Sequence, residues 1–161
     1  MNRHERRARL IALLLPAALL AGAWGAQLIG GLYPCEMCHW QRWPHYAALV
    51  PAALAFAVPR RGLARMLVIA AAVLVAVSGA IGIAHAGVEY HWWSGFTGCT
   101  QTASLAGMDA AARLDAILHA PVVRCDAAQW TFAGISLAGF NAILSLGGAV
   151  LILMLLARKT R

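Results

Sequence analysis

Four cysteines are the residues of this 161-residue chain best suited to chemistry. Cys35 and Cys38 form a C-x-x-C motif, whereas Cys99 and Cys125 lie far along the chain. Thiolates are nucleophiles, metal ligands and the reactants of disulfide exchange. A Cys35–Cys38 disulfide would close a very small ring, which restricts the unfolded chain little and contributes little stability. We therefore interpret this pair as redox-active.

The surroundings of Cys38 favour its thiolate, which is the reactive form. Pro34 precedes the motif, and a helix that begins at or just before Cys38 would place its positive N-terminal end beside that sulfur. Arg42 follows one turn later on the same face and would add a positive charge. The alternative for Arg42 is a side chain that merely reaches the membrane edge. Positive charge is disfavoured on the outer side of a membrane, so an arginine there needs a reason.

Three other interpretations of the cysteines remain open. They are structural disulfides, a zinc site with four cysteine ligands, and a c-type haem attached at C-x-x-C-H, which Cys35 to His39 matches. Cys99 and Cys125 are 26 residues apart and do not form a second close pair of zinc ligands. No axial haem ligand can be singled out from the sequence.

Composition indicates the setting of these cysteines. The chain is 61% apolar and 12% charged, with a mean hydropathy of +0.70, which is too little polar surface for a soluble globule. The net charge of +7 does not indicate a nucleic-acid partner, because the positive residues lie at the ends of long apolar runs and form no basic face. The sequence predicts an integral membrane protein.

Four apolar stretches predict an all-α, four-helix membrane bundle that forms a single domain over residues 1–161. A hydrocarbon core about 30 Å thick needs about 20 residues of helix, and the stretches are residues 10–32, 43–58, 63–86 and 132–157. The second is short, and we expect it to begin in the interface at Trp43 and to kink at Pro51. The first also resembles a cleavable signal peptide, but signal cores are about 7–15 residues and this run is longer. Ser78 with Gly82, and Ala138 with Ala142, would let helices approach closely.

The charges predict the orientation. Ten of the thirteen basic residues lie at the two termini and between the second and third spans, which the positive-inside rule places in the cytoplasm. The outer loops, about residues 31–42 and 87–131, then hold all four cysteines, as expected for an oxidising compartment. Apolar residues at helical spacing in the second loop predict a short helix, either in the membrane interface or packed on the bundle; they are Leu105, Met108, Ala112, Ile117 and Leu118.

Two further groups of residues receive structural expectations. Asn141, inside the fourth span, is expected to make an interhelical hydrogen bond. His91, Trp92 and Trp93 are expected to form an interfacial anchor. His45 receives no role from the sequence.

These features together resemble the disulfide bond formation protein B (DsbB) family of bacterial inner-membrane proteins. The resemblance covers nearly the whole chain and includes the four-span layout and the two cysteines of the second loop. Its motifs are Pro34-Cys35-x-x-Cys38, Gln41-Arg42 and Gln129-Trp130-Thr131-Phe132-x-Gly134.

The resemblance implies a quinone-dependent protein-disulfide oxidoreductase of the inner membrane. A periplasmic thiol oxidase of the DsbA type would reduce a Cys99–Cys125 disulfide by attack at Cys99. Cys125 would then attack Cys35 of a Cys35–Cys38 disulfide and free Cys38 beside a quinone. The acceptor would be ubiquinone or menaquinone. Arg42 matches the family's quinone-linked arginine, and His85 matches a histidine near the quinone, although a generic histidine at a helix end is the alternative for His85.

Other functions remain as alternatives. A quinone reductase of the vitamin K epoxide reductase type also couples a membrane-edge C-x-x-C to outer cysteines, but its motif usually lies late in the chain. A reductant exporter would need cysteines inside the membrane, and none of the four predicted spans contains one. A structural or zinc-binding membrane subunit would hold stable disulfides or bound zinc.

Overall fold

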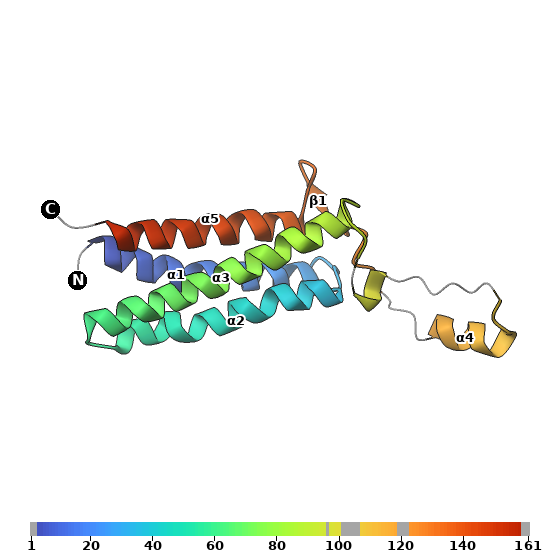
Figure 1. Cartoon of the computed structure of the whole chain (residues 1–161), viewed down its shortest axis with the longest axis horizontal. Helices are drawn as coiled ribbons and strands as arrows, with labels where there is room; N and C mark the ends of the chain where they lie inside the picture. Colours follow the sequence, from blue (N-terminus) through green and yellow to red (C-terminus); the bar gives the residue numbers. More distant parts are fainter. Residues whose placement is uncertain (1–2, 96, 101–106, 119–122, 159–161) are drawn as a thin grey trace.

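Four long helices run back and forth along one axis and form a bundle in the computed structural model (Figure 1). The structure describes residues 3–95, 97–100, 107–118 and 123–158. The bundle helices are α1 (Arg3–Leu28), α2 (Glu36–Ala57), α3 (Arg61–Glu89) and α5 (Leu137–Ala157). The remaining elements lie in the second long connection: a 3-10 turn η1 (Gly98–Thr100), α4 (Ala110–Leu118), and strands β1 (Thr131–Phe132) and β2 (Ile135–Ser136).

Small side chains hold the bundle together. Helix α3 packs against α2 and α5, and α1 packs against the same two helices. The main cluster of buried residues is rich in alanine. Small side chains let helix backbones approach closely, and such packing holds helices together in lipid, where the hydrophobic effect does not drive their association. A Cβ atom added at Gly82 would lie 3.0 Å from both Ala138 O and Ala142 N. The small residues singled out in the sequence therefore lie where α3 and α5 meet backbone to backbone.

Three of the described helices, α1, α3 and α5, are long and apolar enough to cross a membrane. Helix α2 is not among them, since its first turns are polar and it carries Pro44 and Pro51. It nevertheless continues unbroken through both prolines as the fourth helix of the bundle. The start of α1, the α2–α3 turn and the end of α5 lie at one end of the bundle (Figure 1), so the described basic residues next to them share that end. The length and composition of these helices are consistent with a helical membrane bundle.

The helix bounds differ from the expected spans in ways that matter for the site. Helix α2 begins at Glu36, so Cys38 lies in its first turn, as the position of Pro34 suggested. Helix α3 runs three residues past the expected end, to Glu89. Helix α5 begins at Leu137, and not at 132, because β1 and β2 form a two-stranded hairpin in which Thr131 pairs with Ser136. Ala133 and Gly134 adopt positive φ angles of 51° and 79° at this turn, which a helix cannot contain.

Helix α4 lies in the second loop, where the sequence predicts a short helix. Asp109 Oδ1 accepts a hydrogen bond from Ala112 N at 2.8 Å and so caps the helix. The helix stands beyond the end of the bundle (Figure 1) and not on its side, which counts against the packed alternative. Its location in a membrane interface stays a prediction, and Leu105 lies outside the described residues.

Candidate functional site

Cys35 and Cys38 lie at the N-terminus of α2 as two free thiols. Cys35 is the N-cap residue, and its sulfur accepts a hydrogen bond from Cys38 N at 3.3 Å. The Cys35 thiol in turn donates to Cys38 Sγ at 3.0 Å. The hydrogen bond to Cys38 raises the pKa of the Cys35 thiol, and burial raises it further. Cys35 therefore keeps its proton, and negative charge falls on Cys38, where the helix N-terminus stabilises it.

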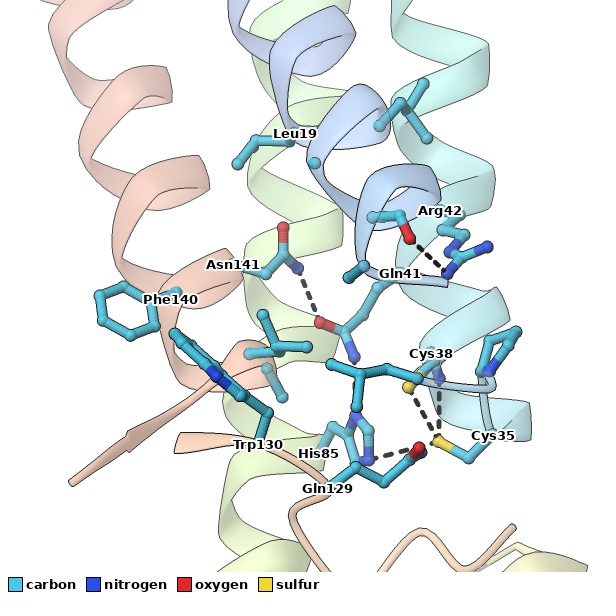
Figure 2. Close-up of a pocket in the computed structure, with 18 of the residues that line it drawn as sticks. Leu19, Cys35, Cys38, Gln41, Arg42, His85, Gln129, Trp130, Phe140 and Asn141 are labelled. Carbon is cyan, nitrogen blue, oxygen red and sulfur yellow. Dashed lines mark hydrogen bonds between the residues drawn. The ribbon is translucent and has the colours of Figure 1, made fainter. Parts of the chain in front are cut away.

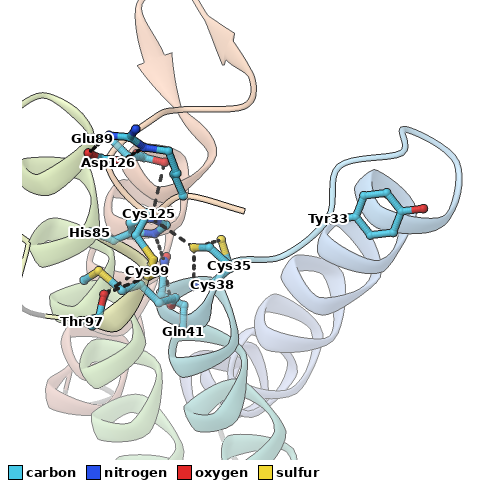
Figure 3. The surroundings of a disulfide bond; sticks show 12 residues. Tyr33, Cys35, Cys38, Gln41, His85, Glu89, Thr97, Cys99, Cys125 and Asp126 are labelled. Carbon is cyan, nitrogen blue, oxygen red and sulfur yellow. Dashed lines mark hydrogen bonds and ion pairs between the residues drawn. A yellow bond between two sulfur atoms is a disulfide. The ribbon is translucent and has the colours of Figure 1, made fainter. Parts of the chain in front are cut away.

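Cys99 and Cys125 form a disulfide that lies beside this pair (Figure 3). This is the pairing that the family resemblance implies. Both residues are buried, at 5% and 0% exposure, and Thr97 Oγ1 lies 2.9 Å from Cys99 Sγ. Cys125 N also donates to Cys99 O at 3.4 Å, so the backbone joins the two segments as well.

The two cysteine pairs meet at one point. Cys125 Sγ, Cys35 Sγ and a ring nitrogen of His85 all lie within 4.8 Å of one another. These cysteines share a buried cluster with Met37 and Val88. Three such ligands resemble part of a metal site, but the Cys125 sulfur is held in the disulfide and offers no thiolate. The geometry instead suits thiol–disulfide exchange between the two pairs, because this reaction requires a thiolate to reach a disulfide sulfur.

His85 is a buried residue at the centre of this arrangement, with 2% of its surface exposed. Its Nε2 lies 3.5 Å from Cys35 Sγ and 3.7 Å from Glu89 Oε1, and its Nδ1 lies 2.8 Å from Gln41 Nε2. Glu89 also accepts a short hydrogen bond from Ser136 Oγ. A generic histidine at a helix end would face water, and this one does not.

A cavity of about 310 Å³ adjoins the C-x-x-C pair (Figure 2). It is bounded by α1, α2, α3, α5 and the segment before β1, and most of its lining is apolar. Among its lining residues are Cys38, Arg42, His85, Trp130 and Phe140. Its volume falls in the range of about 300–1,000 Å³ that is usual for small-molecule sites.

Arg42 lines the cavity and is buried in the bundle, with 9% exposure. Its guanidinium donates to Gln27 Oε1 at 2.6 Å and to Ala23 O at 3.2 Å, and it lies 5.4 Å from the centre of the Trp24 ring. All three partners belong to α1. The arginine is therefore held inside the protein and does not extend to the membrane edge.

Several residues of the site received no role from the sequence. Gln41, Gln129 and Trp130 entered only as family motif residues, and Glu89 was not singled out. Gln129 Nε2 donates to Tyr33 O at 2.7 Å and so ties the segment before β1 to the loop before α2. The motif itself was the signal that could have marked these residues.

Two expectations about polar residues have different outcomes. Asn141 makes the expected interhelical hydrogen bonds, and it joins His45 in the bundle interior at 3.0 Å. Trp92 and Trp93 are exposed, at 67% and 42%, and Trp93 Nε1 donates to Ala84 O at 3.1 Å. Their anchoring role, shared with His91, stays a prediction.

Comparison with known proteins identifies one family. A model of the family "Disulfide bond formation protein DsbB" matches residues 5–155, nearly the whole chain. No curated protein and no solved structure matches the chain.

Proposed function

We propose that this chain, which belongs to the disulfide bond formation protein DsbB family, reoxidises a periplasmic DsbA-type dithiol oxidase and passes the electrons to a membrane quinone. Membership of the family makes it a membrane disulfide oxidoreductase. The observation that carries the finer proposal is the meeting of Cys125 Sγ and Cys35 Sγ within 4.8 Å, next to a cavity that reaches the bundle interior.

The relay begins at the outer pair. A thiolate of the partner attacks Cys99, forms a mixed disulfide and releases Cys125 as a thiolate. The partner's second thiol then closes the partner's own disulfide and frees Cys99. The partner has lost two electrons and two protons, and the Cys99–Cys125 pair has gained two electrons.

The inner pair receives these electrons by a second exchange. Cys125 attacks Cys35 of an oxidised Cys35–Cys38 pair, and Cys38 leaves as the thiolate that the helix N-terminus stabilises. Cys99 then attacks Cys125, which restores the outer disulfide and leaves Cys35 reduced. The structure has this product arrangement, with an outer disulfide and two inner thiols.

The cavity supplies the properties that a quinone needs. A quinone head group is flat and apolar with hydrogen-bond acceptors at its edge, and it accepts two electrons and two protons to become a quinol. The lining offers Trp130 and Phe140 as flat apolar surfaces and Arg42 as a donor at the wall. Cys38 lies in the same wall, so electrons that reach Cys38 are beside the acceptor. Both ubiquinone and menaquinone have such a head group.

The setting of this reaction follows from the charge pattern. We propose a multi-pass protein of the bacterial inner membrane, with all four long helices in the bilayer and both termini in the cytoplasm. The site then faces the periplasm, where the partner is found, and the cavity opens toward the quinone pool.

Two partial reactions test the proposal. The Cys99→Ser variant should lose reaction with a reduced DsbA-type protein but still reduce quinone when dithiothreitol supplies electrons directly to the inner pair. The Cys38→Ser variant should fail in both assays. A Cys38→Ser protein that still reduces quinone would refute the relay. Disulfides that neither the DsbA-type protein nor dithiothreitol reduces, with or without quinone, would return the cysteines to a structural role.

A further inference from the structure

A row of hydrogen-bonded side chains links His85 to the interior of the bundle (Figure 2). Gln41 Nε2 lies 2.8 Å from His85 Nδ1, and Gln41 Oε1 accepts from Asn141 Nδ2 at 2.8 Å. Asn141 Oδ1 lies 3.0 Å from His45 Nε2, so the row joins α3, α2 and α5. The relay described above uses none of these amide groups.

Two backbone carbonyls determine which way the amides point. Met37 O lies 3.3 Å from Gln41 Nε2, and Ser78 O lies 3.1 Å from Asn141 Nδ2. A carbonyl oxygen only accepts, so the amide nitrogen of each side chain, and not its oxygen, must face it. The orientations of Gln41 and Asn141 are therefore consistent with each other and with the backbone.

The orientation of Gln41 sets the tautomer of His85. Because the Gln41 nitrogen is a donor, His85 Nδ1 must accept, and a neutral imidazole then carries its hydrogen on Nε2. That N–H faces Cys35 Sγ at 3.5 Å and the Glu89 carboxylate at 3.7 Å. A doubly protonated ring would set an Nδ1–H against the amide hydrogens of Gln41, so the row also disfavours the charged form.

The tautomer decides where the Cys35 hydrogen goes. A bare Nε2 could act as a base and remove the Cys35 proton, whereas an Nε2–H cannot. The Cys35 hydrogen therefore stays on its sulfur and bonds Cys38 Sγ at 3.0 Å. We propose that Gln41, held by Asn141, is a positioning residue that keeps His85 as the Nε2–H tautomer, so that the ring cannot take the Cys35 proton and the negative charge of the pair stays on Cys38. The inference deepens the proposed function, because it selects the sulfur that faces the cavity. It does not depend on the partner or the quinone.

The test reads the tautomer and the thiolate separately, on the full-length reduced protein in detergent without quinone or partner. ¹⁵N NMR of protein labelled at histidine nitrogens distinguishes a protonated ring nitrogen from a bare one. Limited alkylation followed by fragment mass spectrometry gives the ratio of modified Cys38 to modified Cys35. Gln41→Met keeps the length of the side chain and removes the donor.

In Gln41→Met we expect His85 to lose its Nε2–H preference and the Cys38-to-Cys35 ratio to fall about tenfold, since a hydrogen bond to a charged group is worth at least that factor. Asn141→Leu should shift both readouts in the same direction by less, and it replaces Gln41→Met if that variant does not fold. Ser145→Ala is the matched control, because Ser145 bonds Asn141 Oδ1 at 2.9 Å in the same buried cluster but is not a partner of Gln41 or His85. It should leave both readouts unchanged.

A folded Gln41→Met protein in which His85 stays protonated at Nε2 and the ratio is unchanged would overturn the inference. A ratio that falls equally in Ser145→Ala would also overturn it, since loss of bundle packing would then explain the effect. Quinone reduction by the same variants is measured afterwards, so a failed relay and a failed tautomer assignment are distinguishable.

Discussion

Replacing Cys38 and Cys99 by serine leaves Cys35 and Cys125 as the two thiols of the chain, and we expect them to form a disulfide. Their sulfurs already lie within 4.8 Å, and a disulfide bond is about 2.05 Å long, so they need to approach by no more than about 2.8 Å. Both sulfurs belong to the same buried cluster, which limits competing positions.

The new bond should also stabilise the protein. It closes a loop of about 90 residues, for which the chain-entropy relation gives about 4.6 kcal/mol, and strain from the approach of the two loops reduces the gain. The expected result is a higher temperature of unfolding in detergent under oxidising than under reducing conditions.

The assay exposes the reduced variant to oxidised glutathione, blocks remaining thiols at set times and identifies the linked peptides by mass spectrometry. The matched control is Cys35→Ser with Cys99→Ser, which leaves Cys38 and Cys125. Cys38 is not part of the group of atoms within 4.8 Å, so its bond to Cys125 should form more slowly. A control that closes as fast as the Cys35–Cys125 pair would refute the assignment of Cys35 as the sulfur that Cys125 attacks.

Three further predictions follow from single contacts. Arg42→Ala should raise the quinone concentration that gives half the maximal rate by about tenfold or more, because hydrogen bonds from a charged group are worth about 1.5–3 kcal/mol. The partner concentration that gives half the maximal rate should not change. Steady-state kinetics with an unchanged quinone dependence would contradict this prediction. The raised pKa of Cys35 means that its thiol stays protonated and its alkylation stays slow at pH 9, where a free cysteine with a pKa of about 8.5 is mostly thiolate. Removing the hydrogen-bond partner with Cys38→Ala should therefore speed Cys35 alkylation at that pH, and an unaltered rate would argue against the bond as the cause. Ser136→Ala should lower the free energy of unfolding by about 1 kcal/mol, because Ser136 Oγ caps α5 by accepting from Gly139 N at 3.1 Å; an unchanged chemical-denaturation midpoint would show that the cap contributes nothing.

The sequence predicted the elements that composition and periodicity control. Long apolar runs predicted the bundle, and Pro34 with the C-x-x-C motif predicted that Cys38 would lie at a helix start. The hairpin before α5 was missed because Phe132, Ala133 and Ile135 continue the apolar run of the helix. The positive φ angles of Ala133 and Gly134 are a local backbone property.

The site was predictable only in part for a similar reason. The cysteines can be recognised in the sequence by their type and spacing. Gln41 and Asn141 are 100 residues apart, and their hydrogen bond forms only when α2 and α5 pack together. The family motif marked Gln41 without giving its partner. Burial of Arg42 and His85 likewise depends on neighbours that no local pattern reveals.

The stoichiometry of the complete reaction tests the central claim most directly. A reduced DsbA-type protein is mixed with the purified chain and a quinone, and donor disulfide and quinol are quantified over time. The relay predicts one quinol for each donor disulfide in the unaltered protein, and neither product above background in the Cys38→Ser variant. Donor oxidation without matching quinol, or quinol formation that survives Cys38→Ser, would contradict the account.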